Sequence, residues 1–136
     1  MFTYDELFSF VKQLISLRKS HPVFGQDYEV AGEDKESYGL PEVSYHGEYA
    51  WQPPLGKESR HIGICYSGNV INDSDFYVAY NMHWEEKKLA LPPLPEGKKW
   101  YMIMSTATGF SGDPYVSHNQ KRVEVPARTI EVYIGK

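Results

Sequence analysis

The sequence contains a single cysteine, Cys65, among its 136 residues. An intrachain disulfide is therefore excluded, and a reducing compartment is the natural expectation for such a chain. Cys65 lies in the segment "HIGICYS" without an obvious base beside it that would activate a thiolate. We therefore expect a small buried thiol at this position and not a nucleophile.

Long hydrophobic runs are also missing. Asp5, Glu6 and Lys12 interrupt the N-terminal segment, which argues against a signal peptide, and no segment approaches the length of a membrane span. The net charge of −4 gives no reason to expect nucleic acid or an anionic membrane as a partner. These features together predict a cytoplasmic protein.

Motifs for metal, nucleotide or nucleophilic chemistry do not occur. The sequence has no Gly-rich phosphate loop, dinucleotide fingerprint or Gly-x-Ser-x-Gly, and Asn72–Asp75 lacks the glycine and distal glutamate of a calcium loop. The histidines have no metal-ligand spacing; they are His21, His46, His61, His83 and His118. We therefore predict no catalytic residue, no metal site and no cofactor, and expect a hairpin turn at Asn72–Asp75.

Glycosidic cleavage would require two carboxylates at a suitable separation. The acids of the central region stand in loops and charged turns, with nothing that marks a pair, and we expect them to be solvated turn residues. They are Asp73, Asp75, Glu85, Glu86 and Glu96.

What the sequence does have is a globular composition, with 41% apolar, 24% charged and 15% aromatic residues. This length and composition fit one domain with a real core. The 11 tyrosines and 3 tryptophans favour β structure and offer flat rings on which sugars can stack.

Residues 2–20 carry the one strong helix signal. Thr3 and Glu6 form a capping box, Phe2 and Leu7 are placed for a hydrophobic staple, and Pro22 prevents continuation. The apolar positions span about half of the helix circumference, which is wider than packing on one sheet requires, so we expect this helix to contact two partners. These positions are Leu7, Phe8, Phe10, Val11, Leu14, Ile15 and Leu17.

Residues 23–42 read as an irregular connection, with a solvated loop or hairpin tip at "AGEDKESYG". Seven strand-like runs separated by turn signals follow over residues 43–136, which predicts an antiparallel β-sandwich or barrel with the helix packed on it. The runs are Val43–His46, Arg60–Tyr66, Phe76–Met82, Lys87–Leu91, Lys99–Met104, Arg122–Val125 and Thr129–Ile134. The segment "TATGFSGDPYVSHNQ" is expected to be a loop.

Three tryptophans are the remaining candidates for a site. Alternation places Phe76, Val78, Tyr80, Met82 and Trp84 on one inward face, so Trp84 should cap the core while Asn81 and His83 bond neighbouring backbone groups. Trp100 is expected to be the most buried of the three, and Trp51, in a Pro-containing loop, is the one best placed to be partly exposed. Trp51 and Trp84 are the candidate carbohydrate contacts.

Several segments in order resemble a known family. "LFSFVKQLISLRKSHPVF", "VSYHG", "WQPP", "ESRHIGI", "FYVAYNMHWEE", "LALPPLPEGKKWY" and "VPARTIEVYIG" resemble the last barrel helix and all-β C-terminal domain of isoamylase-type and glycogen-debranching enzymes. These belong to the α-amylase superfamily, glycoside hydrolase family 13. The resemblance covers essentially the whole chain, although "QPPLGKESR" departs from it where relatives carry an acidic-aromatic pair.

The resemblance implies a noncatalytic β-sandwich domain of an enzyme that hydrolyses α-1,6 branch linkages. The family's Asp nucleophile and Glu acid/base lie on a (β/α)₈ barrel, of which this chain would retain only the last helix, so no catalytic residue carries over. The implied partner is that barrel, contacted through Leu7, Phe10, Val11, Leu14 and Leu17, with an α-glucan-binding module as the alternative. The isolated chain is expected to self-associate or to hold its helix loosely.

Overall fold

A computed structural model of the chain describes residues 3–25, 32, 39–54, 56, 58–116 and 119–136. It is mainly β with one long helix, which confirms the predicted fold class. The helical elements are α1 (Tyr4–Ser20), η1 (Pro22–Phe24) and η2 (Asn69–Ile71). The strands are β1 (Val43–His46), β2 (His61–Tyr66), β3 (Asp75–Asn81), β4 (Lys87–Ala90), β5 (Trp100–Ser105), β6 (Gly109–Val116), β7 (Arg122–Val125) and β8 (Thr129–Gly135).

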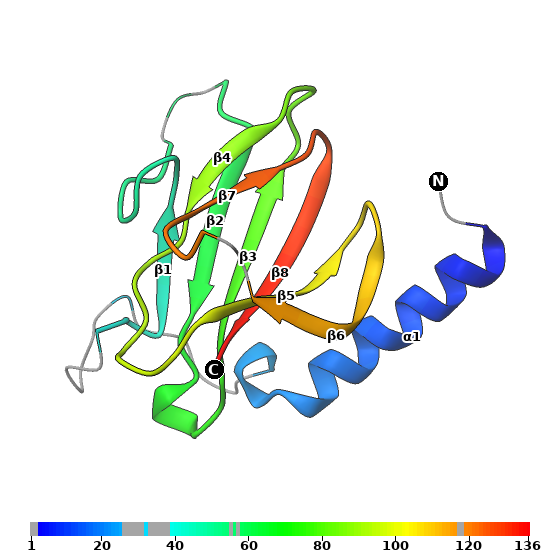
Figure 1. Cartoon of the computed structure of the whole chain (residues 1–136), viewed down its shortest axis with the longest axis horizontal. Coiled ribbons are helices and arrows are strands. Elements are labelled where there is room, and N and C mark those ends of the chain that lie inside the picture. The colour runs from blue at the N-terminus through cyan, green and yellow to red at the C-terminus, as the bar shows by residue number, and fades with distance from the viewer. Residues whose placement is uncertain (1–2, 26–31, 33–38, 55, 57, 117–118) are drawn as a thin grey trace.

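The strands form two antiparallel sheets. Six of them make the larger sheet in the order β1-β2-β3-β8-β5-β6, and β4 pairs with β7 in a separate two-stranded sheet. Figure 1 shows the β4–β7 pair in front of the larger sheet, with α1 running past β6 at the other side. The predicted sandwich with a packed helix is therefore confirmed, and the two layers leave a core on each face of the larger sheet.

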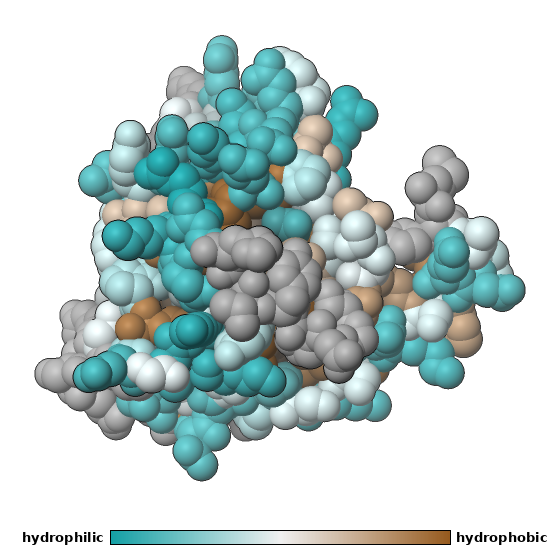
Figure 2. Space-filling model, in the orientation of Figure 1, coloured by the Kyte–Doolittle hydropathy of each residue, from teal (hydrophilic) through white to brown (hydrophobic). Residues whose placement is uncertain are grey.

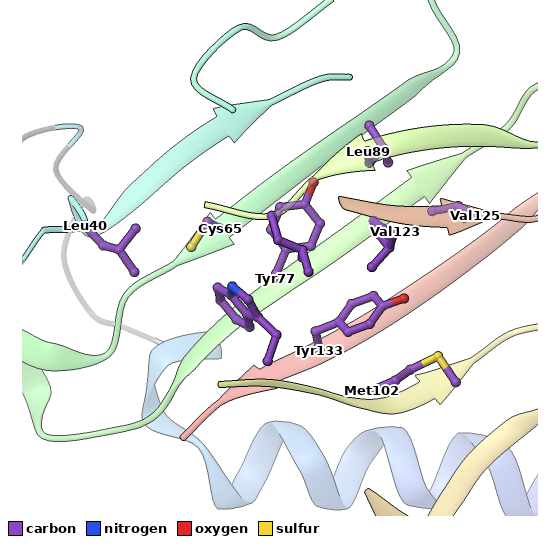
Figure 3. Close-up of a cluster of buried hydrophobic side chains, with 11 residues drawn as sticks. Leu40, Cys65, Tyr77, Leu89, Met102, Val123, Val125 and Tyr133 are labelled. Carbon is purple, nitrogen blue, oxygen red and sulfur yellow. The ribbon is translucent and has the colours of Figure 1, made fainter. Parts of the chain in front are cut away.

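The first core lies between the two sheets. Tyr77 and Tyr133 project from the larger sheet toward Leu89, Val123 and Val125 of the β4–β7 pair, as Figure 3 shows. Trp100 belongs to the same cluster and is almost fully buried, as predicted, with its indole Nε1 donating a hydrogen bond of 2.9 Å to the Pro92 carbonyl.

The second core lies on the opposite face of the larger sheet. Phe76 and Val78 of β3, with Val132 and Ile134 of β8, are buried there beneath Phe10 of α1 and Val23 of η1. β3 is therefore buried on both faces, because each face of a central strand has a cover. Phe76 and Val78 are therefore buried as predicted, but Tyr77 and Ala79 on the other face of β3 are buried as well, so the expectation of a single inward face is wrong.

The start of α1 follows from its capping box. Thr3 Oγ1 accepts a hydrogen bond from the Glu6 backbone N–H at 3.2 Å, and the Glu6 carboxylate accepts one from the Thr3 N–H at 2.7 Å. These two bonds satisfy donors that the first helical turn leaves without partners. The predicted staple involves Phe2, which lies outside the described residues, as does nearly all of the predicted loop "AGEDKESYG".

β6 is the strand that the sequence did not reveal. It occupies Gly109–Val116, within the segment predicted to be a loop, and lies at the edge of the larger sheet beside β5. Pro114 lacks a backbone donor, which an edge strand tolerates because one side needs no partner. Among the described residues, no helix combines the length and the apolar character needed to cross a bilayer.

Candidate functional site

One side of α1 carries a set of large apolar side chains that are exposed to solvent. Its exposed side chains range from 43% exposed at Val11 to 83% at Tyr4. The set comprises Tyr4, Leu7, Phe8, Val11 and Ile15, which we call the outer face of α1. At 100° per residue these five positions occupy one continuous arc of the helix. Figure 1 shows the N-terminal turns of α1 extending beyond β6, and Figure 2 shows hydrophobic side chains along this projecting part.

The side of α1 next to the outer face contacts the chain's own sheet. Phe10 is buried with its ring 5.5 Å from that of Phe110, and Leu14 and Leu17 pack against the second core. These three residues belong to the set predicted to contact a catalytic barrel; Phe10 is buried and Leu14 and Leu17 are half-buried, whereas Leu7 and Val11 of the same set are exposed. The wide apolar arc of α1 therefore has two parts: one is packed against the sheet, and the other is exposed to solvent.

Trp84 does not cap the core. Its side chain is 60% exposed, and Met82 beside it is also exposed. β3 ends at Asn81, so the strand alternation used to place Trp84 inward does not extend that far. The His83 ring stacks on Trp84 with centroids 4.1 Å apart, and the Arg60 guanidinium lies 5.4 Å from the Trp84 ring centroid.

Asn81 and His83 have the structural roles predicted for them. The fully buried Asn81 amide donates hydrogen bonds to the carbonyls of Glu85, Val125 and Pro126 at 2.9–3.0 Å, and its Oδ1 accepts from the His83 N–H. His83 Nδ1 accepts from the Glu85 N–H at 3.1 Å. This side-chain amide joins the β3–β4 turn to the end of β7, because its partners belong to both segments.

Trp51 is the second exposed tryptophan, although less exposed than Trp84. Its side chain is 46% exposed and its backbone adopts a left-handed conformation with φ of 66°. The ring meets the His46 ring edge-on at 4.7 Å, whereas Trp84 contacts His83 and Arg60. The two candidate sugar contacts therefore belong to separate aromatic clusters, and within the part of the chain that the structure describes no ring contact joins them.

A buried serine–histidine pair was missed in the sequence. Ser44 Oγ lies 2.8 Å from His46 Nε2, and His46 Nδ1 accepts a hydrogen bond from the Trp51 N–H at 2.8 Å. Burial lowers the pKa of His46 to about 4, so the ring is neutral near pH 7. Because Nδ1 is an acceptor, the proton resides on Nε2, which donates to Ser44. A histidine in this tautomer cannot remove the serine proton, so the pair is structural.

Asp73 is not the solvated turn residue predicted from the sequence. Its Oδ1 lies 2.8 Å from His21 Nδ1 and accepts from the Ser74 N–H at 2.7 Å, while Oδ2 accepts from the Val23 N–H at 3.2 Å. Burial opposes ionisation, but the bonds from His21, Ser74 and Val23 lower the pKa of Asp73. The carboxylate thereby attaches the end of α1 and η1 to the β2–β3 connection.

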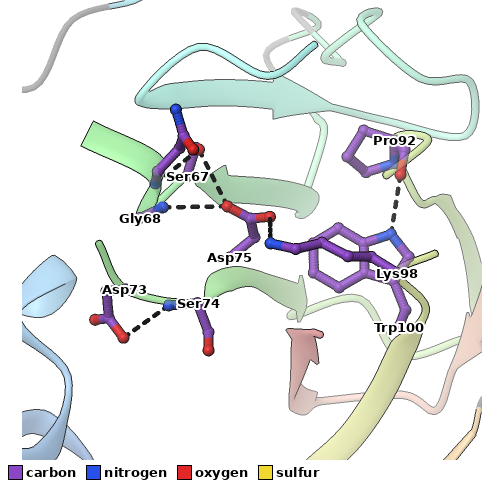
Figure 4. Close-up of polar contacts among 9 residues, drawn as sticks. Ser67, Gly68, Asp73, Ser74, Asp75, Pro92, Lys98 and Trp100 are labelled. Carbon is purple, nitrogen blue, oxygen red and sulfur yellow. Dashed lines mark hydrogen bonds and ion pairs between the residues drawn. The ribbon is translucent and has the colours of Figure 1, made fainter. Parts of the chain in front are cut away.

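Asp75 corrects the same prediction more strongly, because it is fully buried. Figure 4 shows its carboxylate among three partners: Oδ1 accepts from Ser67 Oγ at 3.1 Å and from the Gly68 N–H at 3.2 Å, while Lys98 Nζ is 3.2 Å from Oδ2. The contacts join the β2–β3 connection to the start of β5. The Asn72–Asp75 segment therefore organises polar contacts within the protein. It lies at the end of the hairpin connection between the antiparallel strands β2 and β3, where η2 precedes it.

Cys65 is buried as predicted, and burial raises the pKa of its thiol, which makes it inert as a nucleophile. Across the part of the chain that the structure describes, no three His, Cys, Asp or Glu side chains gather in a way that could hold a metal ion.

Comparison of the sequence with known proteins identifies no family, so a functional argument must start from the sites described above. No protein-family model and no curated protein matches the sequence.

Proposed function

We propose that this chain is the noncatalytic C-terminal β-sandwich domain of a glycogen-debranching enzyme of the α-amylase superfamily, where it stabilises and shields a catalytic barrel. The observation that carries the proposal is the divided apolar surface of α1. One side packs on the sandwich, and the outer face of α1 is free to contact a second body. The last helix of a catalytic barrel would need both contacts, one with the sandwich and one with the barrel. The second body is proposed to be such a barrel because the segments of this chain resemble, in order, those of debranching enzymes. The chain itself would supply no catalytic residue, and it would act in the cytoplasm, in keeping with its single cysteine.

The energetics favour covering the outer face. Complete burial of a large apolar side chain contributes about 1.5–3 kcal/mol, so covering five half-exposed ones contributes on the order of 5 kcal/mol before ordering costs. Two of the exposed side chains are aromatic, Tyr4 and Phe8, and aromatic rings contribute much of the energy of interfaces.

A binding experiment in trans tests the proposal. The barrel of an isoamylase-type debranching enzyme, truncated before its own last helix, would be mixed with this chain and complex formation measured by size-exclusion chromatography and calorimetry. We expect a complex that Val11→Lys abolishes, since it places a charge within the outer face. Ser16→Lys is the matched control, because Ser16 is exposed on the polar side of α1. Absence of a complex, or equal losses in the two variants, would contradict the proposal.

A glucan-binding module is the second candidate, and the exposure of Trp51 and Trp84 favours it. Aromatic rings at the surface can stack on sugars, although His83 and Arg60 already contact Trp84. An affinity gel containing glycogen discriminates between the candidates. Retardation of the chain that is lost in both Trp51→Ala and Trp84→Ala would support the binding module, whereas unchanged mobility would eliminate it.

A further inference from the structure

A cleft of about 630 Å³ lies on the β4–β7 side of the larger sheet, away from α1. Four segments form it: the turn after β1, the chain leaving β4, the start of β5 and the start of β7. Its volume is in the range of sites that hold small molecules, and it is too small for a folded partner.

The base of the cleft is apolar and its rim is cationic. Pro93 and Leu94 supply accessible apolar surface above the almost fully buried Leu91 and Trp100, and Tyr49 adds an exposed ring. The charged residues of the lining are all basic: Lys98, Lys99, Lys121 and Arg122. Glu48 and Glu96 are close in sequence to lining residues, but no carboxylate side chain is among the described residues that form the cleft.

The cations differ in how they are already engaged. Lys98 bonds the buried Asp75 carboxylate, and the Arg122 guanidinium lies 5.0 Å from the Tyr49 ring centroid, which holds it at the cleft. Lys99 and Lys121 are exposed, and neither ammonium forms an ion pair with any residue that the structure describes. Two ammonium groups and one positioned guanidinium are therefore available in a chain whose net charge is −4.

We propose that this cleft binds a small organic phosphate. Lys99, Lys121 and Arg122 would contact the phosphate, because guanidinium groups bind its oxygens with directed hydrogen bonds and ammonium groups add point charges. The apolar base would contact the organic body of the ligand, which is a sugar ring or a nucleobase. The site is independent of the proposed function, since it lies on the side of the molecule opposite the outer face of α1.

An NMR titration of the whole chain tests this assignment. Glucose 1-phosphate and AMP are the two organic phosphates, with glucose and inorganic phosphate as controls, and the backbone amides of Lys99, Lys121 and Arg122 are followed. We expect saturable shifts at these amides with one organic phosphate or both, at a dissociation constant of about 1 mM or lower. Whichever gives the tighter binding identifies the body as a sugar or a nucleoside.

Matched variants connect the shifts to the proposed cations. Lys99→Gln with Lys121→Gln should weaken binding about tenfold, since two exposed ion pairs contribute roughly 0.7 kcal/mol each. Lys12→Gln with Lys19→Gln removes the same charge from α1 and should leave the affinity unchanged. The proposal is overturned if neither organic phosphate shifts the cleft amides, or if both double variants weaken binding equally. It is also overturned if inorganic phosphate binds as tightly as the organic ligands, which would mean an adventitious ion only.

Discussion

At the scale of single residues, Asp75 shows how a polar side chain can maintain the fold from a completely buried position. Its carboxylate accepts hydrogen bonds from Ser67 and Gly68 and pairs with Lys98. A buried carboxylate is tolerated only where such partners replace the water that it loses. The partners come from the β2–β3 connection and from the start of β5, so one side chain fixes two segments that are distant in sequence.

Asp75→Ala should lower the free energy of unfolding by about 3 kcal/mol, because it leaves Lys98, Ser67 and Gly68 without their shared acceptor. Urea unfolding followed by circular dichroism measures the change. Glu85→Ala is the control, since Glu85 is exposed and its ion pair with Lys87 is long, at 4.0 Å; its cost should be below about 0.5 kcal/mol. Similar losses in the two variants would mean that the Asp75 contacts contribute little.

His46 predicts a specific dependence of stability on pH. Its pKa is about 4 in the folded chain and near 6.5 when unfolded, so the unfolded state binds the proton more readily. Stability from the neutral ring is complete above about pH 6.5 and falls as pH decreases toward 4, by at most about 3 kcal/mol. We expect the unfolding free energy to fall less between about pH 7 and pH 5 in His46→Gln than in the unaltered chain. Burial also lowers the pKa of His61, but that group is present in both proteins. Parallel pH profiles would contradict this role for His46.

At the scale of elements, the contact of β2 with β3 depends on a glycine, which has no side chain to obstruct it. A Cβ on Gly63 of β2 would overlap the Tyr77 hydroxyl of β3, and that hydroxyl is buried without a hydrogen-bond partner among the described residues. The Tyr77 ring therefore lies over Gly63 at close range. Burial raises the pKa of the Tyr77 hydroxyl.

Gly63→Ala should cost about 1–3 kcal/mol, because the added methyl group forces the tyrosine or the strand to move. Tyr77→Phe should be neutral or stabilising by about 1 kcal/mol, since it removes a buried polar group that has no partner. In the double variant the cost of Gly63→Ala should decrease but not vanish, because ring carbons of Tyr77 also approach that position. A double-mutant cycle of unfolding free energies measures this coupling, and strict additivity would contradict it.

The elements also show what can be read from this sequence. All seven predicted strands exist to within one residue at either end, because local alternation and turn residues mark them. β6 contains Gly112 and Pro114 and pairs on one side only, so its sequence carries loop signals. The hydrogen bonds of Asp73 and the burial of Asp75 and of the Ser44–His46 pair depend on contacts between distant segments, which a local pattern does not encode. Trp84 was misplaced because alternation was extended beyond the end of β3.

At the scale of the whole molecule, the two faces of the larger sheet are covered unequally. The β4–β7 pair closes the first core and leaves a cationic cleft at its margin. The second core is covered by the C-terminal half of α1 and by η1, while the N-terminal half of the helix extends beyond the sheet. A partner on α1 and a ligand in the cleft would therefore occupy opposite sides and need not compete.

The open side of α1 predicts the behaviour of the isolated chain. Three side chains hold the helix to the sheet, Phe10, Leu14 and Leu17, while five apolar side chains on its outer face remain in water. Without a covering partner, that face should either join a second copy or leave the first turns of α1 loosely held, because a short helix depends on tertiary packing.

We expect light scattering to give a mass above that of the monomer at high concentration, or hydrogen exchange to show low protection of residues 7–17. Val11→Lys should restore the monomeric mass and Ser16→Lys should not. A monomer with full protection of residues 7–17 would mean that the sandwich alone suffices to hold the helix, and the argument for a missing partner would then lose its physical basis.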